Sequence, residues 1–114
     1  MKSFVYAWRG MVYVWREEEN FRVEITATII LIAVMIGTHF TTTEEALTTI
    51  AITMVLGSEI INTILEDTAN ELEPNHHSFI GKIKDMMAAF VLVNSIGAAT
   101  IGLLVFYHHF GVGY

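Results

Sequence analysis

The chain has 114 residues, of which 54% are hydrophobic and only 16% are charged, and its mean hydropathy is +0.53. A soluble domain carries about 25% charged residues, so this composition is typical of one small membrane protein rather than of a soluble enzyme. The chain contains no cysteine, which excludes disulfides, thiolate nucleophiles and zinc–thiolate sites. The net charge is −6, but the basic residues are confined to two segments.

Residues 1–20 are expected to form an amphipathic helix on a membrane surface. Large apolar residues recur there at spacings of four, three and four, which places them on one stripe: Phe4, Trp8, Met11 and Trp15. Tryptophan and tyrosine favour the headgroup level of a bilayer, which suits a helix lying in the membrane plane. The alternative is an amphipathic helix docked on a protein partner. A polar hinge at residues 17–20 ends this segment.

Three apolar segments follow, at residues 23–40, 46–65 and 86–107. At 1.5 Å per residue, a helix of about 20 residues crosses the ~30 Å hydrocarbon core of a bilayer. Thr42 or Thr43 is expected to cap the second helix, and small residues along the third segment permit close helix packing. The predicted fold class is therefore an all-α membrane protein with one surface helix and three transmembrane helices, in a single domain over residues 1–114.

The basic residues indicate the orientation in the membrane. All six lie before the first span or between the second and third spans: Lys2, Arg9, Arg16, Arg22, Lys82 and Lys84. Basic residues concentrate on the cytoplasmic side, which predicts a cytoplasmic N-terminus and an external C-terminus. Three histidines then lie at the external boundary, where they are interpreted as interfacial residues rather than metal ligands: His39, His108 and His109.

A polar stripe crosses the cytoplasmic end of the second span. Its residues are spaced i, i+3, i+4 and i+7, so they share one helix face: Glu59, Asn62, Thr63 and Glu66. A carboxylate in hydrocarbon costs roughly 2.5–3.5 kcal/mol on insertion scales, so an ionisable residue at such a position usually marks a functional site. The alternative is a neutral glutamic acid that hydrogen-bonds a neighbouring helix.

Further charged residues are expected at the same boundary. Glu18 and Glu66 can share a site if the surface helix folds back on the second span, and two carboxylates with open positions suit Mg²⁺. Lys84 can offset phosphate charge, Asp85 can orient Lys84, and Glu59 can accept a proton from an alcohol that enters from the lipid. This set indicates phosphoryl transfer from a nucleotide to a membrane lipid, although the chain has no glycine-rich phosphate loop.

Three segments carry a family resemblance. The most specific is EIINTILE at residues 59–66; the others are GKIKD at 81–85 with two alanines shortly after, and YAWRG at 6–10 with NFR at 20–22. Over residues 3–110 the chain resembles the prokaryotic diacylglycerol kinases, a family that includes the undecaprenol kinases. The resemblance implies a multi-pass lipid kinase of the bacterial cytoplasmic membrane that uses ATP and Mg²⁺. It also implies a homotrimer with active sites shared between subunits, and no nucleic-acid partner.

The resemblance implies a role for each candidate site residue. Glu59 matches the catalytic base, and Asn62 matches the neighbour that positions the site. Glu18 and Glu66 match the metal-binding carboxylates. The implied nucleotide-binding positions are Tyr6, Asn75, His76, His77, Lys84 and Asp85. The implied lipid-substrate positions are Trp8, Arg22, Glu24 and Ala89.

Departures from the family pattern leave the lipid open. The family usually has Asp at the position of Asn70. Residues 20–22 and 61–63 favour an undecaprenol kinase that makes undecaprenyl phosphate, whereas Glu24 favours a diacylglycerol kinase that makes phosphatidic acid. A rival of another class is a small transporter in which Glu59 is proton-coupled. A third is a non-catalytic scaffold. The charged residues at the cytoplasmic boundary argue against the transporter.

Overall fold

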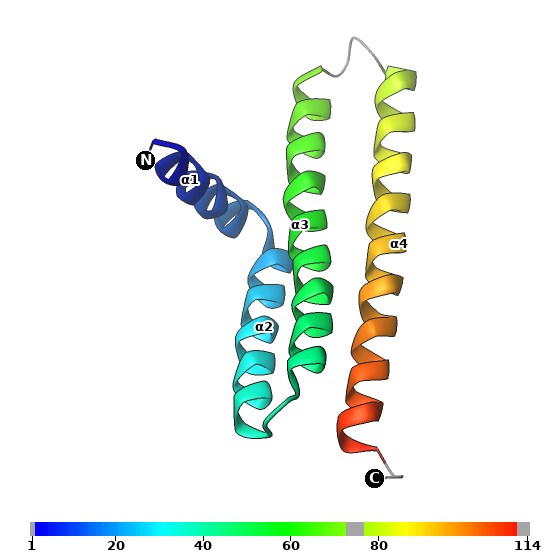
Figure 1. Ribbon diagram of the computed structural model, residues 1–114. Helices are drawn as coiled ribbons and strands as arrows, with labels where there is room; N and C mark the ends of the chain where they lie inside the picture. The colour runs from blue at the N-terminus through cyan, green and yellow to red at the C-terminus, as the bar shows by residue number, and fades with distance from the viewer. Residues whose placement is uncertain (1, 73–76, 112–114) are drawn as a thin grey trace.

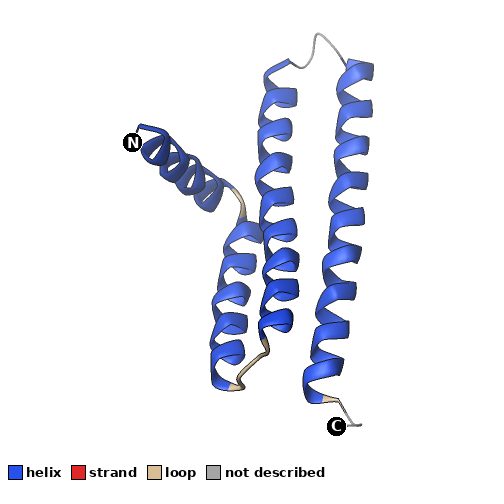
Figure 2. Cartoon of the chain, in the orientation of Figure 1, coloured by secondary structure: helices blue, strands red, loops and turns tan. Residues whose placement is uncertain are grey.

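The computed structural model describes residues 2–72 and 77–111, and all regular structure in this part of the chain is helical (Figures 1 and 2). The elements are α1 (Lys2–Glu17), α2 (Glu19–Gly37), α3 (Thr42–Leu72) and α4 (His77–Phe110). Within the described residues, α2, α3 and α4 are each long and apolar enough to cross a membrane. The prediction of an all-α membrane fold with three spanning helices is therefore confirmed.

Two of the helices are longer than the apolar segments that predict them. α3 has 31 residues and α4 has 34, which corresponds to about 46 and 51 Å at 1.5 Å per residue. A hydrocarbon core is only ~30 Å thick. α3 and α4 run side by side (Figure 1), and α3 packs more extensively on α4 than on α1 or α2. The paired ends at residues 66–72 and 77–85 therefore extend the apolar spans with polar helix.

A single residue, Glu18, separates α1 from α2, and α1 turns away from the other helices there (Figure 1). The backbone of Glu18 is extended, with φ −115° and ψ 110°. Val14 before the break and Phe21 after it are both buried, so apolar side chains anchor the corner. The predicted surface helix at 1–20 thus ends at Glu17, and the next two residues after the break already belong to α2.

A capping box begins α3. The amide of Glu44 donates to Oγ1 of Thr41 at 3.1 Å, and the amide of Thr41 donates to Oε1 of Glu44 at 2.8 Å. The prediction that Thr42 or Thr43 caps this helix is wrong, because Thr41 stands at the capping position. Thr41 is the capping residue because the Glu44 side chain accepts a hydrogen bond from the backbone amide three residues before it.

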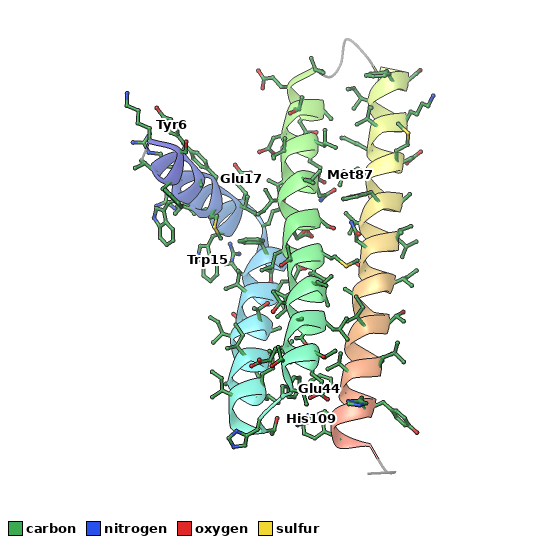
Figure 3. All side chains as sticks on the ribbon, viewed as in Figure 1. Tyr6, Trp15, Glu17, Glu44, Met87 and His109 are labelled. Atoms are coloured by element: carbon green, nitrogen blue, oxygen red, sulfur yellow. The ribbon has the colours of Figure 1, made fainter. Side chains whose placement is uncertain are left out.

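The same glutamate joins the start of α3 to the end of α4. Glu44 is only 3% exposed, and its two carboxylate oxygens lie 2.9 and 2.8 Å from Nδ1 of His108 and of His109. Nε2 of His109, which is labelled in Figure 3, lies 3.0 Å from the carbonyl oxygen of Thr38, and the His109 ring packs on Phe40. The two histidines are therefore partners of a buried carboxylate. Among the described residues, no cluster of three or more acidic or histidine side chains forms a metal site.

We expect Glu44→Gln to lower the thermal midpoint of unfolding clearly more than Glu45→Gln. The amide removes the charge and one acceptor, so a histidine at this end loses a charge-assisted hydrogen bond. Glu45 lies in the same helical turn but is exposed, and exposed substitutions usually change stability by no more than about 0.5 kcal/mol. Thermal unfolding in detergent measures both variants. Equal midpoints would show that Glu44 does not hold the helix ends together.

Candidate active site

Glu59 lies on α3 with only 9% of its surface exposed. Its Oε2 atom is buried and has no hydrogen-bond partner among the described residues. The Glu59 carboxyl lies within electrostatic range of Glu18, at the corner between α1 and α2, and of Glu66, two turns further along α3. Glu24 of α2 is also within electrostatic range of Glu59. The structure thus brings carboxyl groups from the corner, from α2 and from α3 to one region.

The other residues of the polar stripe continue along α3 from Glu59. Thr63 is buried, and its hydroxyl donates to the carbonyl of Glu59 at 3.0 Å. Asn62 and Glu66 line a small cavity of about 140 Å³ between α3 and α4. Met87, labelled in Figure 3, is the buried residue of α4 that lines the same cavity. Because Glu66 is exposed and Glu59 is buried, the stripe leads from the protein surface into the helix bundle.

Lys84 completes the cavity from the side of α4. Its Nζ donates to Oδ1 of Asn70 on α3 at 3.1 Å. Asn70 is neutral, so this bond orients the ammonium group without neutralising its charge. Lys84 and Asn70 are both exposed, and Asp85 is exposed beside them. An anionic group arriving from water can therefore meet a fixed positive charge close to Glu66.

Arg22 holds the corner at which Glu18 lies. Its Nη1 donates to the carbonyl oxygens of Trp15 at 2.6 Å and of Arg16 at 3.2 Å. These carbonyls belong to the last turn of α1, where a helix leaves its acceptors without intrahelical partners. Arg22, predicted as a lipid-substrate position, thus also caps α1 and fixes its direction relative to α2.

A second carboxyl pair, unforeseen in the sequence, joins α1 to α3. The Glu17 side chain hydrogen-bonds with Asp67, and this bond raises the pKa of Glu17, as does the nearby negative charge of Asp67. Glu17 lies beside α3 in Figure 3, and both residues line a hollow of about 630 Å³ between the two helices. Glu17 directly precedes Glu18, and Asp67 directly follows Glu66. The Glu17–Asp67 contact therefore lies next to both candidate metal ligands in the sequence.

The donor set fits a divalent metal of the Mg²⁺ type. Glu18 and Glu66 offer hard carboxylate oxygens and lie near the same third carboxyl, that of Glu59. Among the described residues, no group of three or more acidic or histidine side chains is arranged to hold a metal ion. Mg²⁺ keeps several waters and is usually held by one or two carboxylates together with substrate phosphates. The residues present therefore suit a metal that arrives with a nucleotide.

Comparison with known proteins assigns the family. The model of the family described as prokaryotic diacylglycerol kinase matches residues 5–106. The chain belongs to the prokaryotic diacylglycerol kinase family. It is similar to diacylglycerol kinase of Escherichia coli (strain K12), with 26% identity over 111 residues that cover 97% of this chain and 91% of that protein. It is also similar to undecaprenol kinase of Bacillus subtilis (strain 168), with 30% identity covering 92% of this chain and 85% of that protein. No solved structure matches at a significant level.

Several positions implied by the diacylglycerol kinase pattern lie apart from this region or outside the described residues. Tyr6 is exposed near the free end of α1, away from α3 (Figure 3), where the Arg9 guanidinium lies 5.9 Å from its ring centre. Trp8 is exposed on α1, and Ala89 is exposed on α4. The remaining implied nucleotide positions lie outside the described part of the chain: Asn75, His76 and the side chain of His77.

One polar contact close to Glu59 is not predicted from the sequence. Nδ2 of Asn94 on α4 donates to Oγ of Ser58 on α3 at 2.7 Å. Asn94 stands within an otherwise apolar span, and a side-chain amide there is destabilising unless it is hydrogen-bonded. The signal that identified Glu59, a polar group within an apolar segment, also marks Asn94 in this member of the diacylglycerol kinase family.

Proposed function

We propose that this protein is an ATP- and Mg²⁺-dependent lipid kinase that phosphorylates the hydroxyl of diacylglycerol. The observation that carries the proposal is the Glu59 carboxylate, which is buried within a membrane helix and has an oxygen without a partner among the described residues. Glu66, two turns further along the same helix, lines a cavity together with Lys84. Membership of the prokaryotic diacylglycerol kinase family supports the reaction class.

In the proposed reaction, Glu59 accepts the proton of the lipid hydroxyl as the hydroxyl oxygen attacks the γ-phosphorus of ATP. The bond from the γ-phosphorus to the bridging oxygen breaks, and ADP leaves with its electron pair. Lys84 offsets negative charge on the phosphate oxygens, and Asn70 keeps the ammonium in place. Glu18 and Glu66 would hold Mg²⁺, which when bound offsets the charge of the triphosphate. The transfer is direct, without a phosphorylated side chain.

An apolar cavity supports a lipid as the acceptor. It has a volume of about 330 Å³, lies between α2, α3 and α4, and has Glu24 on its wall. Oε1 of Glu24 is buried and, like Oε2 of Glu59, has no partner among the described residues. The remaining lining is mostly apolar, from residues such as Leu31, Val55 and Phe106. An acyl chain in this cavity would bring the polar end of its lipid next to Glu24, which lies within electrostatic range of Glu59.

The proposed arrangement in the membrane follows from the charges and from the exposed helix faces. The positive-inside rule places α1 and the paired ends of α3 and α4 on the cytoplasmic side, where ATP is available. α4 exposes apolar side chains along its length that suit lipid or further copies of the chain: Leu92, Val93, Leu103 and Leu104. In the homotrimer that family membership favours, residues far from α3 in one subunit, such as Tyr6, can serve a neighbouring site.

A turnover assay with separate lipids tests the function directly. The purified protein, in mixed micelles with ATP and Mg²⁺, is given diacylglycerol in one tube and undecaprenol in another. We expect ATP consumption and phosphatidic acid with diacylglycerol. Turnover with undecaprenol alone would reassign the acceptor and keep the kinase. If neither lipid stimulates turnover by folded protein, the kinase proposal is wrong and the proton-coupled transporter becomes the better hypothesis.

Lys84→Gln is expected to raise the KM for ATP by about ten- to a hundred-fold, because a hydrogen bond to a charged group contributes roughly 1.5–3 kcal/mol. Lys82→Gln is the matched control, since Lys82 is also exposed and lies two residues earlier on α4. Initial rates at varied ATP concentration measure both variants. Equal KM values for the two would rule out the phosphate contact assigned to Lys84.

A further inference from the structure

A hydrogen bond between two membrane helices lies one residue from Glu59. The amide of Asn94 on α4 donates to Oγ of Ser58 on α3 at 2.7 Å, and the Ser58 hydroxyl donates to the carbonyl of Met54 at 2.6 Å. Ser58 is only 4% exposed and Asn94 is half-buried, so the bond is partly buried between the helices that run side by side in Figure 1. The hydroxyl is thus fixed from both sides, by its own helix and by α4.

This bond bears on the direction in which Glu59 points. Successive side chains on an α-helix project about 100° apart, because the helix has 3.6 residues per turn. With Ser58 facing α4, the Glu59 side chain projects about 100° away from that contact. The Glu59 carboxyl lies within electrostatic range of Glu18 at the corner and of Glu24 on α2. A rotation of α3 about its axis would move Glu59 away from both.

The apolar contacts beside this bond do not set the rotation by themselves. Cε of Met54 lies 3.1 Å from the position that a Cβ on Gly97 of α4 would occupy, so a flexible side chain fills the space next to Ser58. Dispersion contacts of this kind are weakly directional, and lipid surroundings give no hydrophobic driving force between helices. A hydrogen bond, by contrast, requires a defined distance and angle.

We propose that Ser58 and Asn94 are positioning residues for Glu59: their hydrogen bond fixes the rotation of α3 and holds the proton-accepting carboxylate toward the lipid hydroxyl. The inference rests on the proposed function of Glu59. Neither residue touches the substrate in this scheme, so the binding of ATP does not depend on them. Their loss therefore affects the chemical step and not nucleotide affinity.

Four variants test the proposal in the full-length protein in mixed micelles. Asn94→Leu and Ser58→Ala are each expected to lower kcat about ten-fold, because small misplacements of a reacting group are costly, while KM for ATP stays within about two-fold. The double variant is expected to be no slower than either single one, since both remove the same bond. Ser58→Thr, which keeps the hydroxyl, is expected to retain most of the activity.

Thr100→Val is the matched control on α4. Its exposed hydroxyl bonds only to its own helix in the described structure, to the carbonyl of Ile96 at 2.8 Å, and its loss is expected to leave kcat unchanged. Wild-type kcat in Asn94→Leu and Ser58→Ala, beside an inactive Glu59→Gln, would overturn the positioning role and leave the proposed function intact. A lower thermal midpoint with unchanged kcat per folded protein would overturn it too. An active Glu59→Gln would instead refute the proposed function.

Discussion

Glu59→Gln is expected to lower kcat by about 10²- to 10⁴-fold, the range over which general base catalysis contributes. Glutamine has nearly the same shape as glutamate, so the packing around this buried position changes little. The amide, however, cannot accept the proton of the lipid hydroxyl. The assay is ATP-dependent phosphorylation of diacylglycerol in mixed micelles, with the protein first shown to be folded and helical.

Glu45→Gln is the matched control, because Glu45 is a glutamate of the same helix that is exposed in the first turn of α3. It is expected to keep wild-type turnover. Near wild-type turnover in Glu59→Gln would mean that the carboxyl group serves only helix association, as the scaffold hypothesis requires.

Glu18→Gln and Glu66→Gln are each expected to reduce activity at a fixed low Mg²⁺ concentration on the order of 10²-fold, because a metal supplies several kcal/mol of charge stabilisation to such a reaction. High Mg²⁺ should restore part of the activity, since one carboxylate and the phosphates remain. Removing divalent metal with a chelator should abolish turnover of the unchanged protein.

Manganese binding followed by electron paramagnetic resonance gives a readout that is independent of turnover. Glu18→Gln and Glu66→Gln should weaken Mn²⁺ binding in the presence of ATP, whereas Glu71→Gln, at an exposed position near the end of α3, should not. Unchanged Mn²⁺ affinity in both Glu18→Gln and Glu66→Gln would remove these residues from the metal site.

The sequence predicts the elements of this fold better than their ends. Three apolar segments of sufficient length specify three membrane helices, because backbone groups in lipid must be hydrogen-bonded within the segment. The ends depend on single side chains. Thr41 begins α3 because Glu44 returns its capping bond, and α1 ends at Glu17, where Arg22 from the next helix caps it. These partners are chosen by geometry that composition and periodicity do not contain.

The same limit applies to the candidate site. The helical period alone aligns Glu59 with Glu66, because both lie on one helix. The bonds that orient the site join distant residues: Lys84 and Asn70 are 14 positions apart, and Asn94 and Ser58 are 36 apart. Such pairs depend on how α3 packs against α4, which no local pattern specifies. Polar residues within apolar spans indicate which side chains need a partner, but they do not indicate which partner each one has.

The central claim, direct transfer of phosphate to a lipid with Glu59 as the base, is tested most directly by a single-turnover experiment. The protein is mixed with ATP labelled on the γ-phosphate and with diacylglycerol, quenched at short times, and the label is counted in the lipid and on the protein. We predict that the label appears in phosphatidic acid without any protein-bound label, and that Glu59→Gln transfers almost none. Protein-bound label that precedes the lipid label, or wild-type transfer by Glu59→Gln, would contradict the mechanism.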